Sequence, residues 1–224
     1  MNLRSACPAR QPCAAQQTPV VFIVDADASV REGMQFPLRA AGWQVETSTS
    51  AEAFLARPRI PGPSCLLTEL HLPGLSGLEL QRQVAEETDL PVIFMSRYAN
   101  VPATVQAMKA GAFEFLTKPF VPEALISAIG DAIQQSHRTI QDHARARALQ
   151  ARYESLSRRE REVMELVASG RMNKQVGGEL GISEITVKAH RGQIMRKMQA
   201  SCLADLVRMQ GRLHELPTLQ RRAC

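Results

Sequence analysis

Short runs that suit β-strands alternate with segments of helical periodicity in the first part of the chain. The clearest run, Val20–Val24, is apolar and rich in β-branched residues, which is typical of a buried parallel strand. Further strands are predicted at Gln44–Thr47, Cys65–Glu69, Pro91–Ser96 and Glu114–Thr117, and helices at 28–41, 50–56, 76–87, 102–110 and 122–150. This alternation predicts an α/β fold, with a doubly wound five-stranded parallel sheet.

Three residues in this part carry local helix signals. Ser50 is the predicted N-cap of the short helix 50–56, and Gly42 is the predicted C-terminal cap of the helix 28–41. Pro37 lies inside that first helix and lacks a backbone N–H, so we expect a kink there.

From Leu156 onward the pattern is helical throughout. Ser157 and Glu160 form a capping box. The helix that they open is expected to run to Ser169 with Gly170 as its C-cap; further helices are predicted at Asn173–Leu180, closed by Gly181, from Ser183 or Glu184 to about Met198, and at Leu203–Leu213. The short turn after Gly181 predicts a helix-turn-helix, and this part is therefore an all-α domain.

The stretch from His137 to Glu154 contains no Pro or Gly and predicts a helical linker that extends the preceding helix. Four isoleucines lie near helical spacing, namely Ile126, Ile129, Ile133 and Ile140; we prefer packing onto the sheet, with self-association along the helix as the alternative. The expected organisation is a disordered leader at 1–19, the α/β domain at 20–136, the linker at 137–153, the helix-turn-helix domain at 154–215 and a tail at 216–224.

Composition excludes several classes of protein. No apolar run reaches about 18 residues, so no membrane span is expected. Residues 1–19 have no apolar core segment and do not resemble a secretory signal. The cysteines are Cys7, Cys13, Cys65, Cys202 and Cys224; their spacing fits no zinc site and their odd number argues against a disulfide framework. A cytoplasmic location is expected, and a redox sensor using Cys7 and Cys13 is a minor alternative.

Charge is distributed unevenly along the chain. Residues 20–137 hold 8 basic and 13 acidic residues, a net charge of −5, whereas residues 138–224 hold 17 basic and 9 acidic residues, a net charge of +8. The basic second part suggests that it meets a polyanion. Solvated helix faces would give the same totals, so charge alone does not decide between the two interpretations.

Four polar residues fall at the carboxyl ends of predicted strands. They are Asp25, Glu69, Ser96 and Lys118. In doubly wound sheets the functional site lies at these ends. The convergence predicts a site there.

The same region resembles the receiver domain of LuxR/FixJ-type response regulators. The motifs that carry the resemblance are Val21–Asp27, Leu72–Leu80, Pro91–Ser96, Met108–Ala112 and Phe115–Phe120, and the match covers Val20 to about Ser136. The family signature of a lysine followed by a cis-proline falls at Lys118–Pro119.

The resemblance implies a phosphate-driven switch whose chemistry is altered here. In the family two adjacent acids hold magnesium, an aspartate accepts the phosphoryl group, a Ser/Thr and a lysine bind its oxygens, and an aromatic residue rotates. This chain keeps Asp25, but Ala26 stands beside it, and Asp27 is not a usual ligand. Glu69 replaces the aspartate; Ser96, Lys118 and Phe115 match the remaining positions. Magnesium binding is therefore expected to be weak or lost, and no cofactor is expected.

Three interpretations of the altered site remain open. Glu69 is long enough to approach Lys118 and Ser96, so it could imitate a phosphorylated aspartate. It could instead form an inert ion pair with Lys118, or the site could still be phosphorylated slowly. The loop Arg97–Asn100 replaces a glycine-containing stretch of the family. Its Arg97 and Tyr98 are expected to cover the pocket and suit a locked receiver, unless the loop has only drifted.

In the second part, Leu156–Val163, Asn173–Lys174 and Leu180–His190 resemble the LuxR-type helix-turn-helix, and the match covers about Tyr153 to Leu213. In its third helix we expect a core stripe of Val187, His190, Ile194 and Met198, and an outward face of Lys188, Ala189, Arg191, Gly192 and Met195. Lys188 is expected to contact base edges or phosphate, and phosphate contacts are expected from Thr186, Arg191, Arg196 and Lys197. Gly177 and Gly178 are unusual inside a helix. The last helix, with Leu203, Leu206, Val207 and Leu213, pairs subunits in relatives.

These observations predict a cytoplasmic, DNA-binding transcriptional regulator that is not an enzyme and does not depend on phosphorylation. The expected partners are double-stranded DNA, a second copy of the chain through the receiver or the C-terminal helix, and a sensor kinase or other protein; no membrane is expected. The alternatives are a conventional response regulator phosphorylated by a kinase, and an interaction protein that sequesters a partner.

Overall fold

The structure, a computed structural model, describes residues 18–58, 60–97 and 101–220. The leader expected at 1–19 lies almost wholly outside these residues, as do Tyr98 and the end of the expected tail. The described chain forms two compact units. One comprises the residues up to Val84 together with Leu90–His137, and the other comprises Ala85–Asp89 and the residues from Arg138 on.

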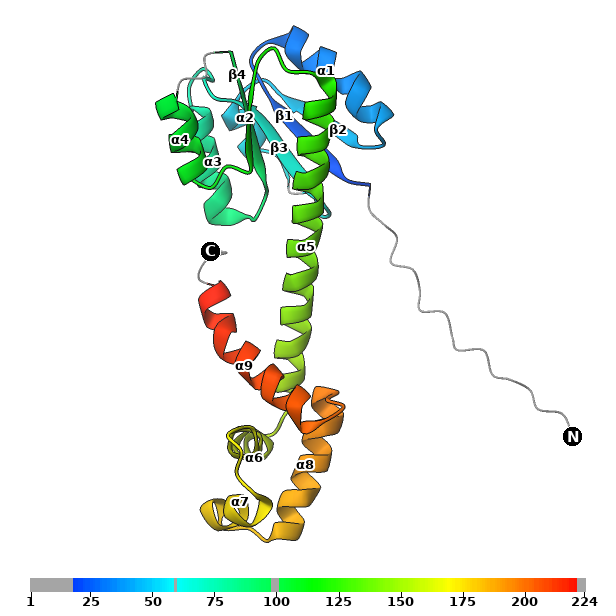
Figure 1. Ribbon diagram of the computed structural model, residues 1–224, viewed down its shortest axis with the longest axis vertical. Helices are drawn as coiled ribbons and strands as arrows, with labels where there is room; N and C mark the ends of the chain where they lie inside the picture. The colour runs from blue at the N-terminus through cyan, green and yellow to red at the C-terminus, as the bar shows by residue number, and fades with distance from the viewer. Residues whose placement is uncertain (1–17, 59, 98–100, 221–224) are drawn as a thin grey trace, which may run out of the picture. The chain divides into compact units, whose positions relative to one another are not determined.

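The first unit is built on the predicted five-stranded parallel sheet (Figure 1). Its strands are β1 (Val20–Val24), β2 (Gln44–Ser48), β3 (Ser64–Glu69), β4 (Val92–Ser96) and β5 (Glu114–Thr117). They lie side by side in the order β2-β1-β3-β4-β5. Because every neighbouring pair is parallel, all five carboxyl ends lie at one edge of the sheet.

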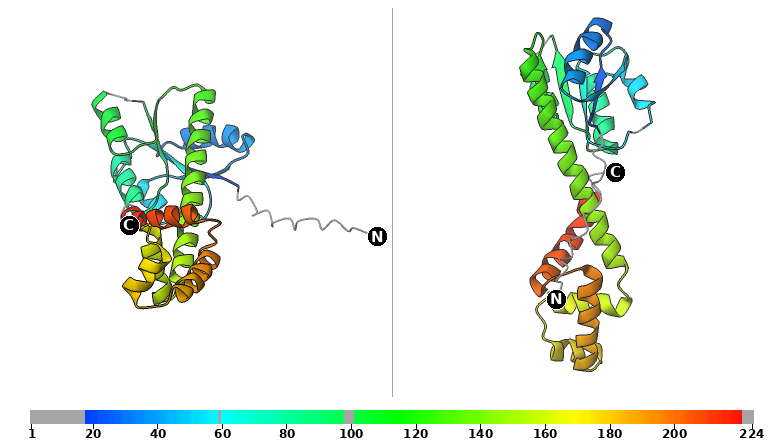
Figure 2. Two further views of the ribbon diagram at one scale, coloured as in Figure 1. Left: turned by 60° about the horizontal axis from the view of Figure 1, so that its bottom comes forward. Right: turned by 90° about the vertical axis from the view of Figure 1, so that its right-hand side faces the viewer.

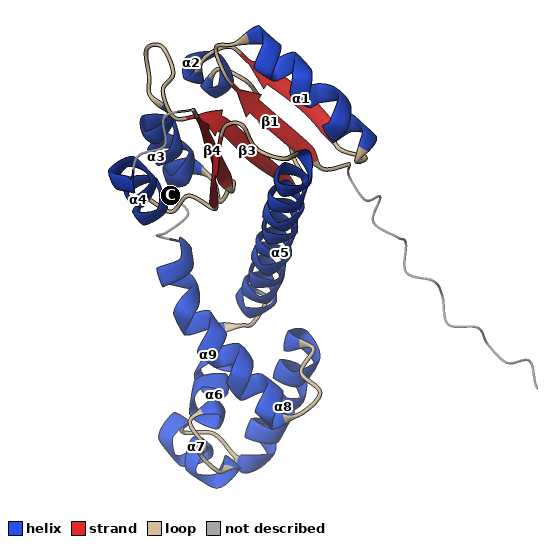
Figure 3. Ribbon diagram, turned by 45° about the horizontal axis from the view of Figure 1, so that its top comes forward, coloured by secondary structure: helices blue, strands red, loops and turns tan. Residues whose placement is uncertain are grey.

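Helices cover both faces of this sheet, as a doubly wound fold requires (Figure 3). They are α1 (Ala28–Ala40), α2 (Ala51–Leu55), α3 (Gly77–Glu87), α4 (Val101–Lys109) and α5 (Pro122–Glu154). α1 and α5 pack on one face around a core that includes Leu38 and Ile129. α2, α3 and α4 pack on the other face around Leu80 and Phe94.

Local signals in the sequence placed most of these boundaries. The Ser50 side chain accepts a hydrogen bond from the Ala53 N–H, which confirms Ser50 as the N-cap of α2. α1 continues through Pro37 and ends at Ala40; its C-cap is Ala41 rather than the predicted Gly42, which is the next residue and has a φ of +91°. The Lys118–Pro119 bond is cis, as predicted.

α5 continues without a break to Glu154, which confirms that His137–Glu154 extends the preceding helix. Ile129 and Ile133 are buried against the sheet, which supports the packing interpretation for these two residues. Ile140 lies further along α5 and its side chain is 41% exposed.

The second unit contains the end of α5 and four more helices (Figure 2, yellow to red). They are α6 (Arg158–Ala168), α7 (Asn173–Leu180), α8 (Glu184–Met198) and α9 (Leu203–Gln220). Their core includes Val163, Val176 and Ile194, and Leu149 and Tyr153 of α5 pack into it.

Capping residues mark the ends of several helices in this unit. The capping box of Ser157 and Glu160 is present, and Ser183 caps α8. Ser169 rather than Gly170 is the C-cap of α6, because Gly170, with φ +88°, is the next residue and has already left the helical conformation. α9 is longer than the predicted Leu203–Leu213, since no glycine follows Leu213 to end it. Among the helices of the described residues, none is long and apolar enough to cross a bilayer.

Candidate functional site

The parallel register brings the predicted strand-end residues to one edge of the sheet. Asp25 follows β1 and its N–H donates to the Ser48 carbonyl, 3.3 Å away. Lys118 follows β5 and its N–H donates to the Ser96 carbonyl, 2.9 Å away. Glu69 ends β3, and the Asp25 and Ser96 side chains are buried.

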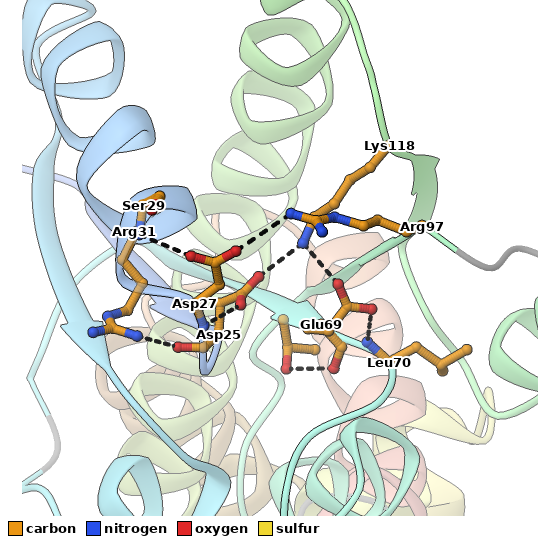
Figure 4. Close-up of polar contacts among 9 residues, drawn as sticks. Asp25, Asp27, Ser29, Arg31, Glu69, Leu70, Arg97 and Lys118 are labelled. Atoms are coloured by element: carbon orange, nitrogen blue, oxygen red, sulfur yellow. Dashed lines mark hydrogen bonds and ion pairs between the residues drawn. The ribbon is translucent and has the colours of Figure 1, made fainter.

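Lys118 joins two of these strand ends through its ammonium group (Figure 4). The Lys118 Nζ lies 2.8 Å from Asp25 Oδ2 and 2.7 Å from Glu69 Oε2. The lysine side chain is only 11% exposed, so the attraction is screened less than at the surface. The Lys118 ammonium group therefore pairs with two carboxylates in a mostly buried position.

Backbone amides take the remaining oxygens of both carboxylates. Asp25 Oδ1 accepts the Asp27 N–H at 2.9 Å, and Glu69 Oε1 accepts the Leu70 N–H, also at 2.9 Å. Each of the four carboxylate oxygens thus has a donor within the protein. The Arg31 guanidinium adds a bond of 2.6 Å to the Asp25 carbonyl.

Asp27 has a different role from its neighbours. Its Oδ1 accepts the Ser29 N–H at 2.9 Å, which caps α1, and its Oδ2 lies 3.3 Å from an Arg97 guanidinium nitrogen. The bond from the Ser29 N–H is the main reason why the pKa of the Asp27 carboxyl lies below its ordinary value. The contact places Arg97 at the pocket, as the sequence suggested.

These residues do not fit a magnesium ion while Lys118 keeps both contacts. Magnesium requires near-octahedral oxygen coordination, usually from carboxylates and water. Asp25 and Glu69 already face a cation, Asp27 is engaged as a helix cap, and Ala26 offers no side-chain oxygen. The oxygen donors that remain are too few without a displacement of Lys118.

A pocket of about 220 Å³ opens at this edge of the sheet. It is lined by Asp25, Ala26, Asp27, Val30, Glu69, His71, Arg97 and Lys118. The sequence alone did not predict His71 or Arg31 at this site; the position of His71 in the loop that follows Glu69 was the available signal. Phe115 does not line the pocket: its ring packs 6.2 Å from the Phe94 ring, on the α3 and α4 face of the sheet.

The turn after β3 depends on Gly77. A Cβ atom at Gly77 would lie 2.4 Å from the Glu69 carbonyl oxygen, closer than real Cβ contacts. The Gly77 N–H also donates to the Leu70 carbonyl at 3.1 Å. This close approach fixes the backbone on which the Glu69 carboxylate is mounted.

In the second unit α8 has one buried face and one exposed face. Val187, Ile194 and Met198 are fully buried, as predicted, whereas His190 is only half-buried. Met195 packs against the core, so its predicted place on the outward face was wrong. Because His190 was counted as a core residue, the outward face of α8 was predicted at a position rotated about the helix axis from the observed one.

The basic residues of α8 differ in what holds them. Lys188 is exposed and pairs with Glu184 one turn earlier, at 3.1 Å. Arg191 is partly buried and donates to Asn173 Oδ1 at 2.7 Å. The exposed Arg196 contacts Gln193 on its own helix.

Lys197 reaches into the domain and not outward. Its Nζ lies 2.6 Å from Oε2 of the buried Glu160 and 3.3 Å from the Ser155 carbonyl. Burial would raise the pKa of the Glu160 carboxyl, but the hydrogen bonds from Lys197 and Ser157 outweigh it, and the pKa is lowered. Glu160 therefore stabilises the fold above its unfolded pKa, and this contribution is lost as the pH falls through the lower folded value.

Of the two unusual glycines in α7, Gly177 has a structural reason. A Cβ atom there would lie 2.7 Å from the Ile182 carbonyl oxygen in the turn between α7 and α8. A Cβ atom at Gly178 would meet no heavy atom within 4 Å. Only the first glycine is required by the helix-turn-helix.

An α/β unit with charged residues at its strand ends and a separate helix-turn-helix unit are the parts of a DNA-binding regulator. The family model "Response regulator receiver domain" matches residues 21–130, and the model "Bacterial regulatory proteins, luxR family" matches residues 154–210.

Similar proteins match across both units. Nodulation protein W of Bradyrhizobium diazoefficiens is 42% identical over 191 residues, covering 85% of this chain and 84% of the relative. Response regulator protein TodT of Pseudomonas putida is 40% identical over 215 residues, covering 93% of this chain and 95% of the relative. The solved structure of the response regulator StyR is 42% identical and has a TM-score of 0.77, covering 87% of this chain and 99% of that chain.

The chain therefore belongs to the NarL/FixJ-type response regulators, transcription factors that join a receiver domain to a LuxR-type DNA-binding domain. This membership confirms the predicted family and fold class. It also agrees with the expectation of a DNA-binding regulator that is not an enzyme.

Proposed function

We propose that this transcription factor works without phosphorylation, because Glu69 and Lys118 form a permanent ion pair in the receiver pocket. The observation that carries the proposal is the distance of 2.7 Å between Lys118 Nζ and Glu69 Oε2. The other Glu69 oxygen is held by the Leu70 N–H. The carboxylate that would have to attack a phosphodonor is thus held by two donors of the protein itself.

Two further features support phosphorylation independence. Glu69 carries one methylene more than the aspartate of the family, and a misplacement of about 1 Å can slow a reaction ~100-fold. Ala26 removes an acid from the magnesium site. A receiver with both changes lacks the metal and the nucleophile geometry that phosphoryl transfer requires.

Treatment with acetyl phosphate and magnesium tests this proposal. Intact-mass measurement is expected to show no phosphoryl adduct on the natural chain after an hour. The double variant Ala26→Asp, Glu69→Asp restores both acids and is the matched control, for which an adduct is expected. A stoichiometric adduct on Glu69 would contradict the proposal and support a conventional, kinase-driven regulator.

We further propose that α8 supplies the DNA contacts. The residues assigned to this surface are Thr186, Lys188, Ala189, Arg191, Gly192, Arg196 and Lys197. Lys188 and Arg196 are exposed and free to reorient, because their intrahelical partners also lie in water. Arg191 and Lys197 are held by Asn173 and Glu160, so they contribute positive potential more than direct contacts.

The wider assignment is a cytoplasmic homodimer, with residues 20–136 as receiver, 137–153 as linker and 154–215 as DNA-binding domain. The last helix or the receiver would supply the dimer contact, and a sensor kinase or another protein would supply the input. Sedimentation of the untreated chain, with and without DNA, tests the dimer. High-affinity binding by a dimer without phosphodonor supports a receiver held in its active form, whereas a monomer in both conditions contradicts the assignment.

A further inference from the structure

Between residues 185 and 192, the face of α8 turned away from the domain core carries a strip of apolar residues. α-Helical geometry advances about 100° per residue, so the direction opposite the buried Val187 and Ile194 belongs to Ile185, Ala189 and Gly192. The Ile185 side chain is 80% exposed. Ala189 and Gly192 are exposed as well, and a Cβ atom at Gly192 would meet nothing within 4 Å.

The chemistry of this strip is distinctive. Its three residues present methyl groups or bare backbone and no hydrogen-bonding side chain. Lys188 and Gln193 are exposed at its two sides, and the exposed Arg196 points in the same direction one turn beyond Gly192. Single apolar side chains are common on protein surfaces, but Ile185 stands in the middle of the helix face that faces DNA in the proposed function.

We infer that Ile185 reads the 5-methyl group of a thymine in the major groove. Residues near the N-terminus of a recognition helix contact base edges, and Ile185 is the second residue of α8. Thymine is the base that presents a methyl group in this groove, and apolar side chains recognise it by contact. Ala189 and Gly192 let the helix approach the bases closely. The inference rests on DNA binding through α8.

Deoxyuridine substitution tests the contact directly, because it removes the thymine methyl and nothing else. A target is first selected from random duplexes with the full-length chain, and each thymine is then replaced in turn. One thymine per half-site is expected whose replacement weakens binding by the natural chain about fourfold, the value of one buried methyl group. The Ile185→Ala variant is expected to bind both duplexes equally.

Two variants serve as controls. Ile185→Val keeps a branched side chain and is expected to retain most of the fourfold effect. Met172→Ala removes an apolar side chain that is 68% exposed outside α8, and it is expected to leave the effect unchanged.

The possible outcomes separate the inference from the function beneath it. If the natural chain binds a selected sequence but deoxyuridine has no effect at any position, the Ile185 contact is wrong and DNA binding stands. The Ile185 contact is equally contradicted if Ile185→Ala keeps the fourfold difference. If no sequence is enriched at all, both the contact and sequence recognition by α8 are contradicted.

Discussion

Lys118 is the residue on which the charge balance of the receiver pocket depends. Its ammonium group is the common partner of Asp25 and Glu69, both mostly buried. Removing one partner of a buried ion pair leaves an uncompensated charge, which is more destabilising than loss of the pair as a whole. Here two carboxylates would be left without their shared cation, close to each other.

The variant Lys118→Met is therefore expected to lower the free energy of unfolding of the receiver by ~3 kcal/mol at neutral pH. Trp43, the single tryptophan, packs against the receiver core and reports this unfolding by fluorescence in urea. Lys109→Met, at an exposed lysine of α4, is the control, and an equal loss there would remove the special role of Lys118.

At the scale of elements, the turn between α7 and α8 is set by a contact between a glycine and a backbone carbonyl. The N–H of Ile182 donates to the Gly177 carbonyl at 2.9 Å, while the Ile182 oxygen occupies the space beside the Gly177 Cα. Gly181 follows α7 with φ +67°. The angle between the two helices thus depends on a missing methyl group.

Substituting the two neighbouring glycines of α7 should have opposite effects. Gly177→Ala forces the turn away from α7 and is expected to cost about 2 kcal/mol, as overpacking does. Gly178→Ala has open space and is expected to stabilise the helix by up to ~1 kcal/mol. Thermal unfolding followed by circular dichroism measures both, with Trp43 fluorescence unaffected. Stabilisation by both substitutions would show that the turn tolerates the methyl group.

Element boundaries were predictable wherever a cap or a change of period marked them. Ser50, Ser157 and Ser183 each cap the expected helix, and the strand ends converged as predicted. Contacts between elements were not predictable. The pair of Lys197 with Glu160 joins α8 to α6, and a single sequence gives no sign of such a pair. Met195 was assigned to the wrong face because helical periodicity gives the spacing of the buried residues but not the direction on which the buried face is centred.

For the whole molecule, the separation of charge along the chain is the property that DNA binding exploits. Residues from Arg138 on carry the net charge of +8, against −5 for residues 20–137. The acidic part repels a polyanion and the basic part attracts it, so association with DNA should be orientated and sensitive to salt.

Lys188→Ala and Arg196→Ala are each expected to reduce the slope of log K against log salt by about 1, the value of one phosphate contact. Arg145→Ala, an exposed arginine in α5, is the matched control and should leave the slope unchanged. Fluorescence anisotropy between 50 and 200 mM salt, roughly the range over which phosphate contacts weaken binding, provides the measurement. If the slope of log K against log salt is the same for Lys188→Ala, Arg196→Ala and Arg145→Ala, the phosphate contacts are made by other residues.

The burial of Leu149 and Tyr153 has a consequence for how the two halves can be recombined. The LuxR-family match starts at residue 154, but Leu149 belongs to the core around Val163 and Ile194, and the partly buried Tyr153 packs against it. Arg152 also reaches the Met198 carbonyl, at 3.5 Å. The boundary of the family match is thus not the boundary of the folded domain. A chimaera joined at residue 154 would take part of the core of its DNA-binding domain from the other protein, whereas one joined before Leu149 would keep that core intact.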